Sequence, residues 1–382
     1  MAAAGWRTSE NTSKSRKRYS RTDGLKRTLA TARGDRSPAQ SAGNAKGVSF
    51  SPNKRGHRTA RACLRPAASL AGNEMVTKIR RIVSRLPTHI ADIKENPRWL
   101  PMFTLGRVML FRKLAWRLNA PPAQLDLTNT LFPEVDTEQV AERLRRDGLF
   151  QGFRLPADIS SEISSFARRT PCFGNFDRKL ELLARDHRAA EFATGRAILT
   201  GHFFERVLDC EAARRLQQDP LLLQIAQNYL GGEARVTATR LWWSFPTERA
   251  SDYDLHFASQ NRFHFDLDDW RMIKYFFYIE AVDQDSGPHL YVLGSHRQRL
   301  LRHQFTLLVG QSSEDIERIY GREAIVELTG AQGFGFVEDP FGFHTGSLAR
   351  SGPRLALEIA FGVSEKLHRR FHGEPVVRSL DC

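Results

Sequence analysis

The arrangement of short apolar runs in the second half of the chain most constrains its fold. From Ala234 onward these runs are rich in aromatic and β-branched side chains, and turn-forming residues separate them, as at 285–288 and 338–340. Such a pattern predicts β-strands, which we expect at residues 235–245, 271–282, 290–293, 324–327, 333–338 and 355–363. Several short strands of this kind indicate a jelly-roll barrel that holds its ligand between two sheets.

The region before Ala234 has helical periodicity instead. Asp136 precedes an apolar series that runs into Asp147-Gly148, which predicts a helix capped by the aspartate and ended by the glycine. A short strand is expected at 150–153 and a helix at 156–167, followed by two or three helices within 178–230, the clearest at 220–230. The predicted fold class is therefore mainly β with flanking helices.

Residues 75–128 form a predicted helical extension ahead of a main domain at 129–382. A candidate helix within it, Trp99 to Leu118, combines an apolar stripe with Arg107, Arg112, Lys113 and Arg117. Such a basic amphipathic helix is compatible with binding on an anionic bilayer. Because most surface helices have this pattern, we expect the stripe to pack on the main domain.

The positive charge of the chain is concentrated at its start. Of the net +14, residues 1–74 contribute 16 Lys and Arg against 4 Asp and Glu, or +12, which leaves +2 for residues 75–382. With few large apolar groups, residues 1–74 are predicted to be a disordered basic tail. A transit peptide and a gene-model extension before Met75 stay open as alternatives. No specific nucleic-acid partner is expected for the near-neutral main domain.

The cysteines and the apolar segments indicate a location. Cys63, Cys172, Cys210 and Cys382 are far apart and include no CxxC pair, so neither a disulfide framework nor a zinc ribbon is expected. No window approaches the roughly 20 apolar residues of a membrane span, and the start of the chain lacks the apolar core of a secretion signal. We expect a reduced, cytoplasmic setting. Oligomeric state is not predicted.

His264-Phe265-Asp266 begins the candidate site. Two residues apart on a strand, the histidine and the aspartate project from the same face about 6.6 Å apart, which is compatible with one metal ion. His344 supplies the second imidazole of a non-haem Fe(II) facial triad of two histidines and one carboxylate. Ten residues later Arg354 offers the planar fork that binds the carboxylate of an oxo-acid.

Several other residues near these motifs have a functional and a simpler interpretation. His256, His289 and His296 lack a carboxylate at matching spacing and are expected to be structural or to support the ligands. Lys274 is expected to be a surface lysine, with a contact to an oxo-acid as the alternative, and Asp268 a rim residue, with a substrate contact as the alternative. Trp242 and Trp243 are expected to be core residues, although one of the two is also placed to stack on substrate.

Four motifs in this order resemble the phytanoyl-CoA dioxygenase family. They are Asp147-Gly148-Leu149-Phe150, His264-Phe265-Asp266, the run from Asp285 to Arg297, and His344 with Arg354, within residues 135–365. The resemblance implies a double-stranded β-helix of the cupin type that uses Fe(II) and 2-oxoglutarate. It also implies that His264, Asp266 and His344 bind iron and that Arg354 pairs with the distal carboxylate of 2-oxoglutarate. The chain departs from the family at Leu293, where a proline is common, and at 345–349.

The resemblance implies oxidative decarboxylation of 2-oxoglutarate to succinate and carbon dioxide. Dioxygen would be the co-substrate, and a C–H bond of a small-molecule or carrier-bound substrate would be hydroxylated. Related halogenases have a small residue in place of the carboxylate ligand, so Asp266 favours hydroxylation. The alternative is a catalytically silent jelly roll with a binding or regulatory role, whose basic tail contacts nucleic acid or membrane. The complete triad and the arginine favour the enzyme. The substrate is not predicted, because the loops select it.

Overall fold

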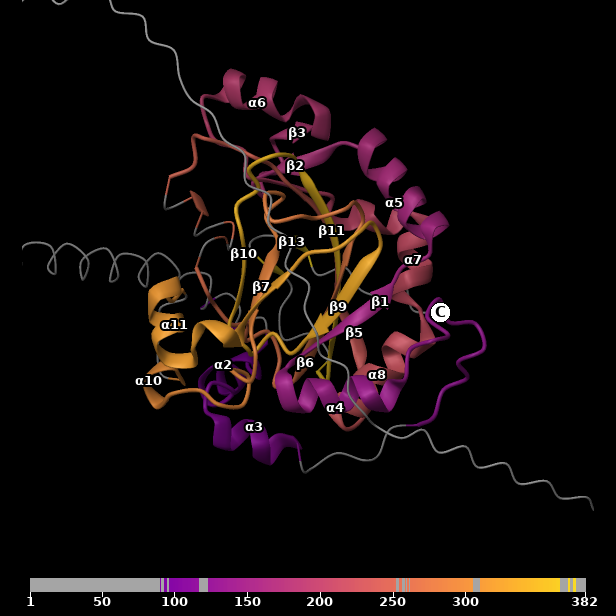
Figure 1. The fold of residues 1–382 in the computed structure, drawn as a ribbon, viewed down its shortest axis with the longest axis vertical. Helices are drawn as coiled ribbons and strands as arrows, with labels where there is room; N and C mark the ends of the chain where they lie inside the picture. The colour runs from indigo at the N-terminus through magenta and orange to yellow at the C-terminus, as the bar shows by residue number, and fades with distance from the viewer. Residues whose placement is uncertain are drawn as a thin grey trace, which may run out of the picture. The chain divides into compact units, whose positions relative to one another are not determined.

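The structure is a computed structural model of the 382-residue chain (Figure 1). It describes residues 96–116, 123–251, 262–304 and 310–364, with positions 90, 93–94, 254–255, 258, 260, 370–371 and 374–375. The chain divides into units 1–64 and 65–382, and every described residue belongs to the second. The predicted tail at 1–74 and His256 lie outside the described residues. The boundary between 128 and 129 stays a prediction.

The larger of two β-sheets contains most of the predicted strands. In the described residues its strand order is β1-β9-β6-β11-β5-β4-β2-β3, and the pairs are antiparallel. The strands are β1 Leu149–Arg154, β2 Cys172–Gly174, β3 Glu181–Leu182, β4 Thr200–His202, β5 Arg235–Ser244, β6 Met272–Tyr278, β9 Phe334–Glu338 and β11 Arg354–Gly362.

The smaller sheet has the order β10-β7-β8, from β7 (His289–Val292), β8 (Ile325–Leu328) and β10 (His344–Gly346). His264 joins its edge through a bridge to His344. From β5 the chain therefore alternates between the sheets except at the step from β7 to β8, with β5, β6, β9 and β11 in the larger one and residue 264, β7, β8 and β10 in the smaller one. This alternation is the double-stranded β-helix, so the predicted fold class is confirmed. A separate hairpin pairs β12 (Arg370–Phe371) with β13 (Glu374–Pro375).

Alternate residues of the central strands separate an outer core from the barrel interior. On β6, Tyr275 and Phe277 belong to the large cluster on the helical side, whereas Phe276 and Tyr278 belong to a second cluster between the sheets. Every residue of β6 and of β11 is buried. Because successive side chains on a strand point to opposite faces, these strands have protein on both sides. Lys274, at the same parity as Phe276, is thereby directed into the interior.

Helices cover the outer face of the larger sheet. α8 packs against β6 and β11, and α4 packs against α8; Figure 1 shows α5 and α7 on the same side. The helices of the main domain are α4 Thr137–Asp147, α5 Ala157–Arg169, α6 His187–Thr194, α7 Glu211–Gln217, α8 Pro220–Leu230, α10 Leu301–Gln304 and α11 Ser313–Tyr320, with 3-10 turns at Ala184–Asp186, Phe204–Asp209 and Arg322–Ala324.

The predicted helix ends are confirmed in α4 and α8. The Asp136 carboxylate accepts hydrogen bonds from the backbone N–H groups of Glu138 and Gln139, and Gly148 ends α4 in the left-handed conformation at φ 79°. Asp219 caps α8 in the same way, with Pro220 at its first position and Gly231 at its end. These residues satisfy backbone groups that a helix end leaves unpaired, so the boundaries follow from local chemistry.

The predicted single helix from Trp99 to Leu118 is wrong. The described residues form two short helices, α2 (Trp99–Leu105) and α3 (Met109–Trp116). A side chain at Gly106 would come within 2.5 Å of the Met102 carbonyl oxygen, so glycine permits the tight turn between them. α2 packs as expected, with Trp99 and Met102 buried against Trp270.

The sequence did not predict β2, β3, β4 or β10. Each has only two or three residues, too few to show a period. Cys172 and Cys210 are free and buried, as the absence of a disulfide framework requires. No helix among the described residues has the length and apolar character to cross a bilayer.

Candidate metal centre

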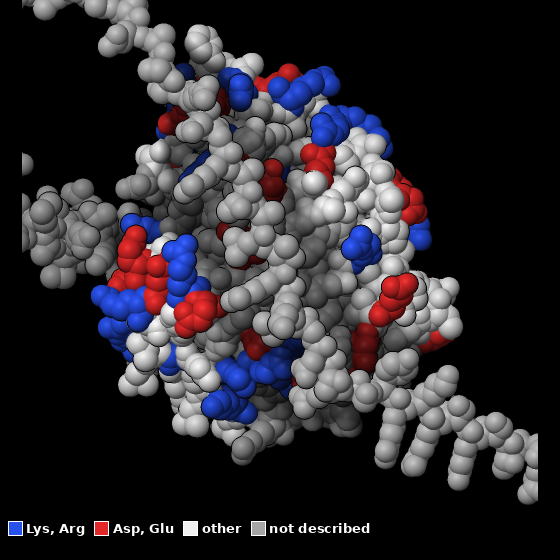
Figure 2. Space-filling view, viewed as in Figure 1, with Lys and Arg blue, Asp and Glu red and all other residues white. Residues whose placement is uncertain are grey.

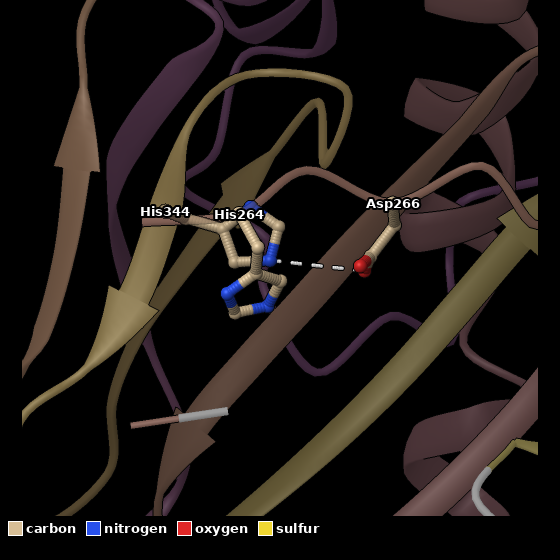
Figure 3. Close-up of side chains that lie close together, drawn as sticks. All are labelled: His264, Asp266 and His344. Carbon is tan, nitrogen blue, oxygen red and sulfur yellow. Dashed lines mark ion pairs between the residues drawn. The ribbon is translucent and has the colours of Figure 1, made fainter. Parts of the chain in front are cut away.

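His264, Asp266 and His344 converge in the interior of the barrel (Figure 3). One ligand atom from each lies within 4.8 Å of the others, and all three residues are buried. The Nε2 atom of His344 is 3.7 Å from Oδ2 of Asp266, and the two imidazole centroids are 4.4 Å apart. Among the described residues, this is the only group of three His, Cys, Asp or Glu that satisfies the geometry of a metal site.

Backbone pairing joins these segments, which are far apart in the sequence. The N–H of His264 donates to the carbonyl of His344 at 2.9 Å, and the N–H of His344 donates back at 2.9 Å. The N–H of Asp266 donates to the Pro340 carbonyl at 2.8 Å. The expected regular strand through the triplet is wrong, since only His264 makes a β-bridge and the backbone at 265–267 is irregular. The convergence therefore depends on contacts with the segment 340–344.

The two imidazoles are oriented by their own backbone. Nδ1 of His264 lies 3.2 Å from the carbonyl oxygen of Arg262, and Nδ1 of His344 lies 3.0 Å from that of Gly342. Because a carbonyl only accepts, Nδ1 is the donor in each ring, which leaves Nε2 as the atom that faces a ligand bond. Burial, aided by the neighbouring His264, lowers the pKa of His344 to about 4, so that imidazole is neutral at pH 7.

The prediction that Lys274 is a surface lysine is wrong. Its ammonium group is buried 2.7 Å from Oδ2 of Asp266, 3.4 Å from Oε1 of Glu358 and 3.7 Å from Oδ2 of Asp268. Burial disfavours the ammonium ion, but Asp266 and Glu358 outweigh it and raise the pKa of Lys274. The carboxylates come from outside β6, so the local sequence around Lys274 gave no signal of this burial.

The same ion pair fixes the charge of Asp266. Burial alone would raise the pKa of Asp266, but Lys274, His344 and His264 outweigh it and hold that pKa well below its usual range. The carboxylate is therefore ionised and available to a cation. Asp268 is partly exposed beside Lys274, in keeping with a rim position. On the far side of Glu358, Arg240 extends the network at 3.4 Å.

Glu338 is a residue of the site that sequence reasoning missed. Its side chain is fully buried, with Oε2 2.9 Å from Nε2 of His289 and Oε1 3.8 Å from Nδ1 of His344. Burial raises the pKa of Glu338 to about 7, and burial also lowers that of His289 to about 3. One feature of the sequence could have revealed it. Glu338 falls at the same alternating positions of β9 as Phe334 and Phe336, which face the interior. His289 thus supports the site through Glu338, as expected of a residue outside the ligand set.

Arg354 is the first residue of β11, and its side chain points into the interior on the same face of the strand as Ala356 and Glu358. Its Nη1 donates to the Gly287 carbonyl and its Nη2 to Oγ of Ser244 at 3.1 Å. Nε is buried with no hydrogen-bond partner, and no carboxylate of a described residue makes an ion pair with this guanidinium. Burial lowers the pKa of Arg354, while Tyr278 opposes that change. The arginine is thus a buried cation with room in its bonding for an anionic ligand.

The other predicted residues lie around the site. Trp243 is buried in the outer core, whereas Trp242 packs against the interior cluster and lies edge-on to Phe276 at 6.4 Å. Trp242 is therefore the tryptophan that faces the interior. Nε2 of His296 lies 3.3 Å from the Arg145 carbonyl, which joins the loop after β7 to α4.

The arrangement fits a divalent metal ion that takes nitrogen and oxygen ligands. Two imidazoles and one ionised carboxylate are already close together, and backbone carbonyls and a lysine hold them in place. In an octahedral ion such a set leaves three positions for other ligands, as in non-haem Fe(II) sites.

No family model matches the chain, and no curated protein matches it. Solved structures with similarity include the "non-heme alpha ketoglutarate dependent epimerase SnoN from nogalamycin biosynthesis", at 17% identity over 59% of this chain and 82% of that one, with TM-score 0.43. EctD from S. alaskensis with bound Fe has 18% identity over 68% and 93%, with TM-score 0.40. AviO1 from Streptomyces viridochromogenes Tue57 has 18% identity over 61% and 96%, with TM-score 0.37. The function proposed below depends on the geometry of this chain's own residues.

Proposed function

We propose that this protein is an Fe(II)- and 2-oxoglutarate-dependent oxygenase that hydroxylates a C–H bond of a small-molecule or carrier-bound substrate. One observation carries the proposal: two imidazoles and a carboxylate converge in a buried cluster inside a double-stranded β-helix. His264, Asp266 and His344 would hold the iron. The order of motifs that resembles the phytanoyl-CoA dioxygenases is compatible with this reaction.

Arg354 would bind the distal carboxylate of 2-oxoglutarate. A buried guanidinium without a carboxylate partner is costly unless an anion approaches it, and 2-oxoglutarate supplies two carboxylates. The forked N–H groups match a carboxylate, and two other hydrogen bonds already fix their direction. Ser244 and Gly287 would therefore position the arginine for the ligand.

The chain's other residues would orient the ligands and exclude water. Lys274 would keep Asp266 ionised and fix its rotamer, while the carbonyls of Arg262 and Gly342 would keep the ligand nitrogens deprotonated. Phe276 and Phe336, stacked at 5.1 Å, form part of the apolar wall of the interior. When bound, iron with 2-oxoglutarate and dioxygen supplies the oxidising power, with succinate and carbon dioxide as products.

The proposal is tested by succinate release from 2-oxoglutarate in the presence of Fe(II) and ascorbate, without added substrate. Wild type is expected to release succinate, and His264→Ala is expected to lose both that activity and retained iron, measured by elemental analysis. Arg354→Met should keep the iron and raise the KM for 2-oxoglutarate, because the arginine contacts the oxo-acid and not the metal.

A matched control is His187→Ala, which removes a buried imidazole that stacks on Phe245 outside the site. It should retain iron and activity in proportion to the folded fraction. Equal iron content and equal succinate release in wild type and His264→Ala would overturn the assignment.

A further inference from the structure

The exposed large apolar side chains of the described residues are concentrated in one area. Of nine such residues, seven lie on α2, on α3 or at the start of α10. We call this group the apolar patch: Leu100 and Leu105 of α2, Leu110, Phe111 and Leu114 of α3, and Leu300 and Leu301 at α10. Single exposed apolar residues are ordinary on protein surfaces, but a cluster of them marks a binding surface.

The three segments of the patch are held together by contacts on their buried side. The N–H of Met109 in α3 donates to Oε1 of Gln304 in α10 at 3.0 Å. The Arg112 guanidinium lies 3.8 Å from the centroid of the Phe341 ring. Together with the burial of Trp99 and Met102, these contacts fix the helices on the domain through the faces that do not bear the leucines.

α3 is oriented opposite to an ordinary surface helix. It buries Arg112, which is 8% exposed, while Leu110 is 70% and Leu114 55% exposed. An amphipathic helix that needed only the domain as its partner would turn its leucines inward and its arginine to water. The expectation that the stripe packs on the main domain is therefore wrong for α3, and no described residue covers Leu110 and Leu114.

The segments that carry the patch have charge of one sign. Residues 96–116 and 293–304 contain no Asp or Glu, and their basic residues that are at least partly exposed are Arg98, Arg107, Lys113, Arg297 and Arg302, whereas Arg112 and Arg299 are buried. Figure 2 shows Lys and Arg side chains in the lower part of the view, where Figure 1 places α2 and α3. The acidic side chains of α11 lie higher in the same view. Leucines surrounded by basic residues are complementary to a surface with an anionic outer layer and an apolar layer below it.

We propose that the apolar patch binds the surface of an anionic lipid membrane, with α3 lying in the plane of the interface. Leucine and phenylalanine side chains would enter the acyl boundary, while Arg107 and Lys113 would lie among the phosphates. A second copy of this chain is a poorer partner, because two basic surfaces would face each other. The binding is independent of the metal centre, so its test needs neither iron nor 2-oxoglutarate.

The test is co-sedimentation of the full chain with vesicles of phosphatidylcholine, with and without phosphatidylglycerol. Wild type is expected to bind the vesicles that contain phosphatidylglycerol, and salt should weaken the binding. Leu110→Ser with Leu114→Ser should reduce binding on the order of tenfold, because two exposed leucines that would enter the membrane lose their apolar contact with it. Serine leaves the net charge unchanged, so any contribution from the basic residues 1–74 is equal in both proteins.

Phe192→Ser is the matched control, since Phe192 is 81% exposed on α6 and lies outside the patch. It should bind vesicles as wild type does. The proposal is overturned if the double variant binds as well as the control, or if the wild type binds vesicles with and without phosphatidylglycerol equally. Light scattering adds one further outcome: a wild-type dimer that the double variant loses would assign the patch to a second copy.

Discussion

At the scale of single residues, the interior of the barrel is controlled by buried charges that neutralise one another. Lys274 connects Asp266 to Glu358, and Glu358 connects to Arg240. Buried ions are tolerated only when each has a partner, so the removal of one member leaves another uncompensated. This makes the network a sensitive point for stability.

Lys274→Met is expected to destabilise the metal-free protein by about 3–5 kcal/mol, because Asp266 and Glu358 lose their shared cation. Urea unfolding followed by circular dichroism measures the change. Arg318→Met serves as the control, since its partner Asp315 is on the exposed face of α11. That exposed pair should contribute at most about 1 kcal/mol. Equal effects of the two substitutions would contradict the buried network.

Glu338 gives the metal-free protein a pH dependence of known sign. Folding raises its pKa from 4.5 to about 7, so the folded state holds a proton that the unfolded state has released between these values. The contribution of Glu338 to stability therefore falls as the pH rises through this window, by on the order of 3 kcal/mol in total, whereas His289 and His344, whose pKa values folding lowers, contribute in the opposite direction. Glu338→Gln should remove the Glu338 contribution, so the stability of the variant should rise more steeply with pH than that of the wild type. Unfolding midpoints at about pH 5 and pH 7 measure it, and a variant with the wild-type slope would contradict the assignment.

At the scale of secondary-structure elements, two glycines that end helices differ in what surrounds them. Both are left-handed, Gly148 after α4 at φ 79° and Gly195 after α6 at φ 67°. A Cβ on Gly148 would lie 2.3 Å from Oη of Tyr291 and 2.5 Å from Nδ1 of His296. A Cβ on Gly195 would meet nothing within 4 Å. Glycine is therefore needed at 148 both for the left-handed backbone and because no side chain fits there, whereas at 195 it is needed for the backbone conformation alone.

Gly195→Ala is expected to cost about 1–2 kcal/mol, which is the strain of a side chain in the left-handed region. Gly148→Ala should cost a further 1–3 kcal/mol or so, because Tyr291 and His296 must move. Thermal unfolding of the two variants side by side gives the comparison. Equal losses would show that the close approach at Gly148 relaxes without cost.

At the scale of the whole molecule, the candidate site depends on the barrel being closed. The bridge between His264 and His344 and the bond from Asp266 to Pro340 join two distant parts of the chain. An ion bound to all three residues would hold these parts together, so metal affinity and folding are coupled.

Mn(II) is expected to raise the unfolding temperature of the wild-type protein. At a concentration 100 times its Kd, the ion should add about 2.7 kcal/mol to the free energy of unfolding. Removal of the ion by a chelator should reverse the effect. His344→Ala should lose the response, because the ligand that closes the barrel is gone, whereas His187→Ala should keep it. Differential scanning fluorimetry measures both. An unchanged response in His344→Ala would place the metal elsewhere.

Local patterns in the sequence predicted the longer strands of the barrel and the helix ends at Asp136 and Gly148, and they supplied the three candidate ligands in order. The strands and helix ends depend on the spacing and the capping chemistry of residues that are close together in the sequence. Only the tertiary structure decided that Lys274 is buried beside Asp266, that Glu338 joins His289 to His344, and that α3 turns its leucines outward. The physical reason is that each of these depends on partners from distant segments, which sheet register brings together and no local period encodes.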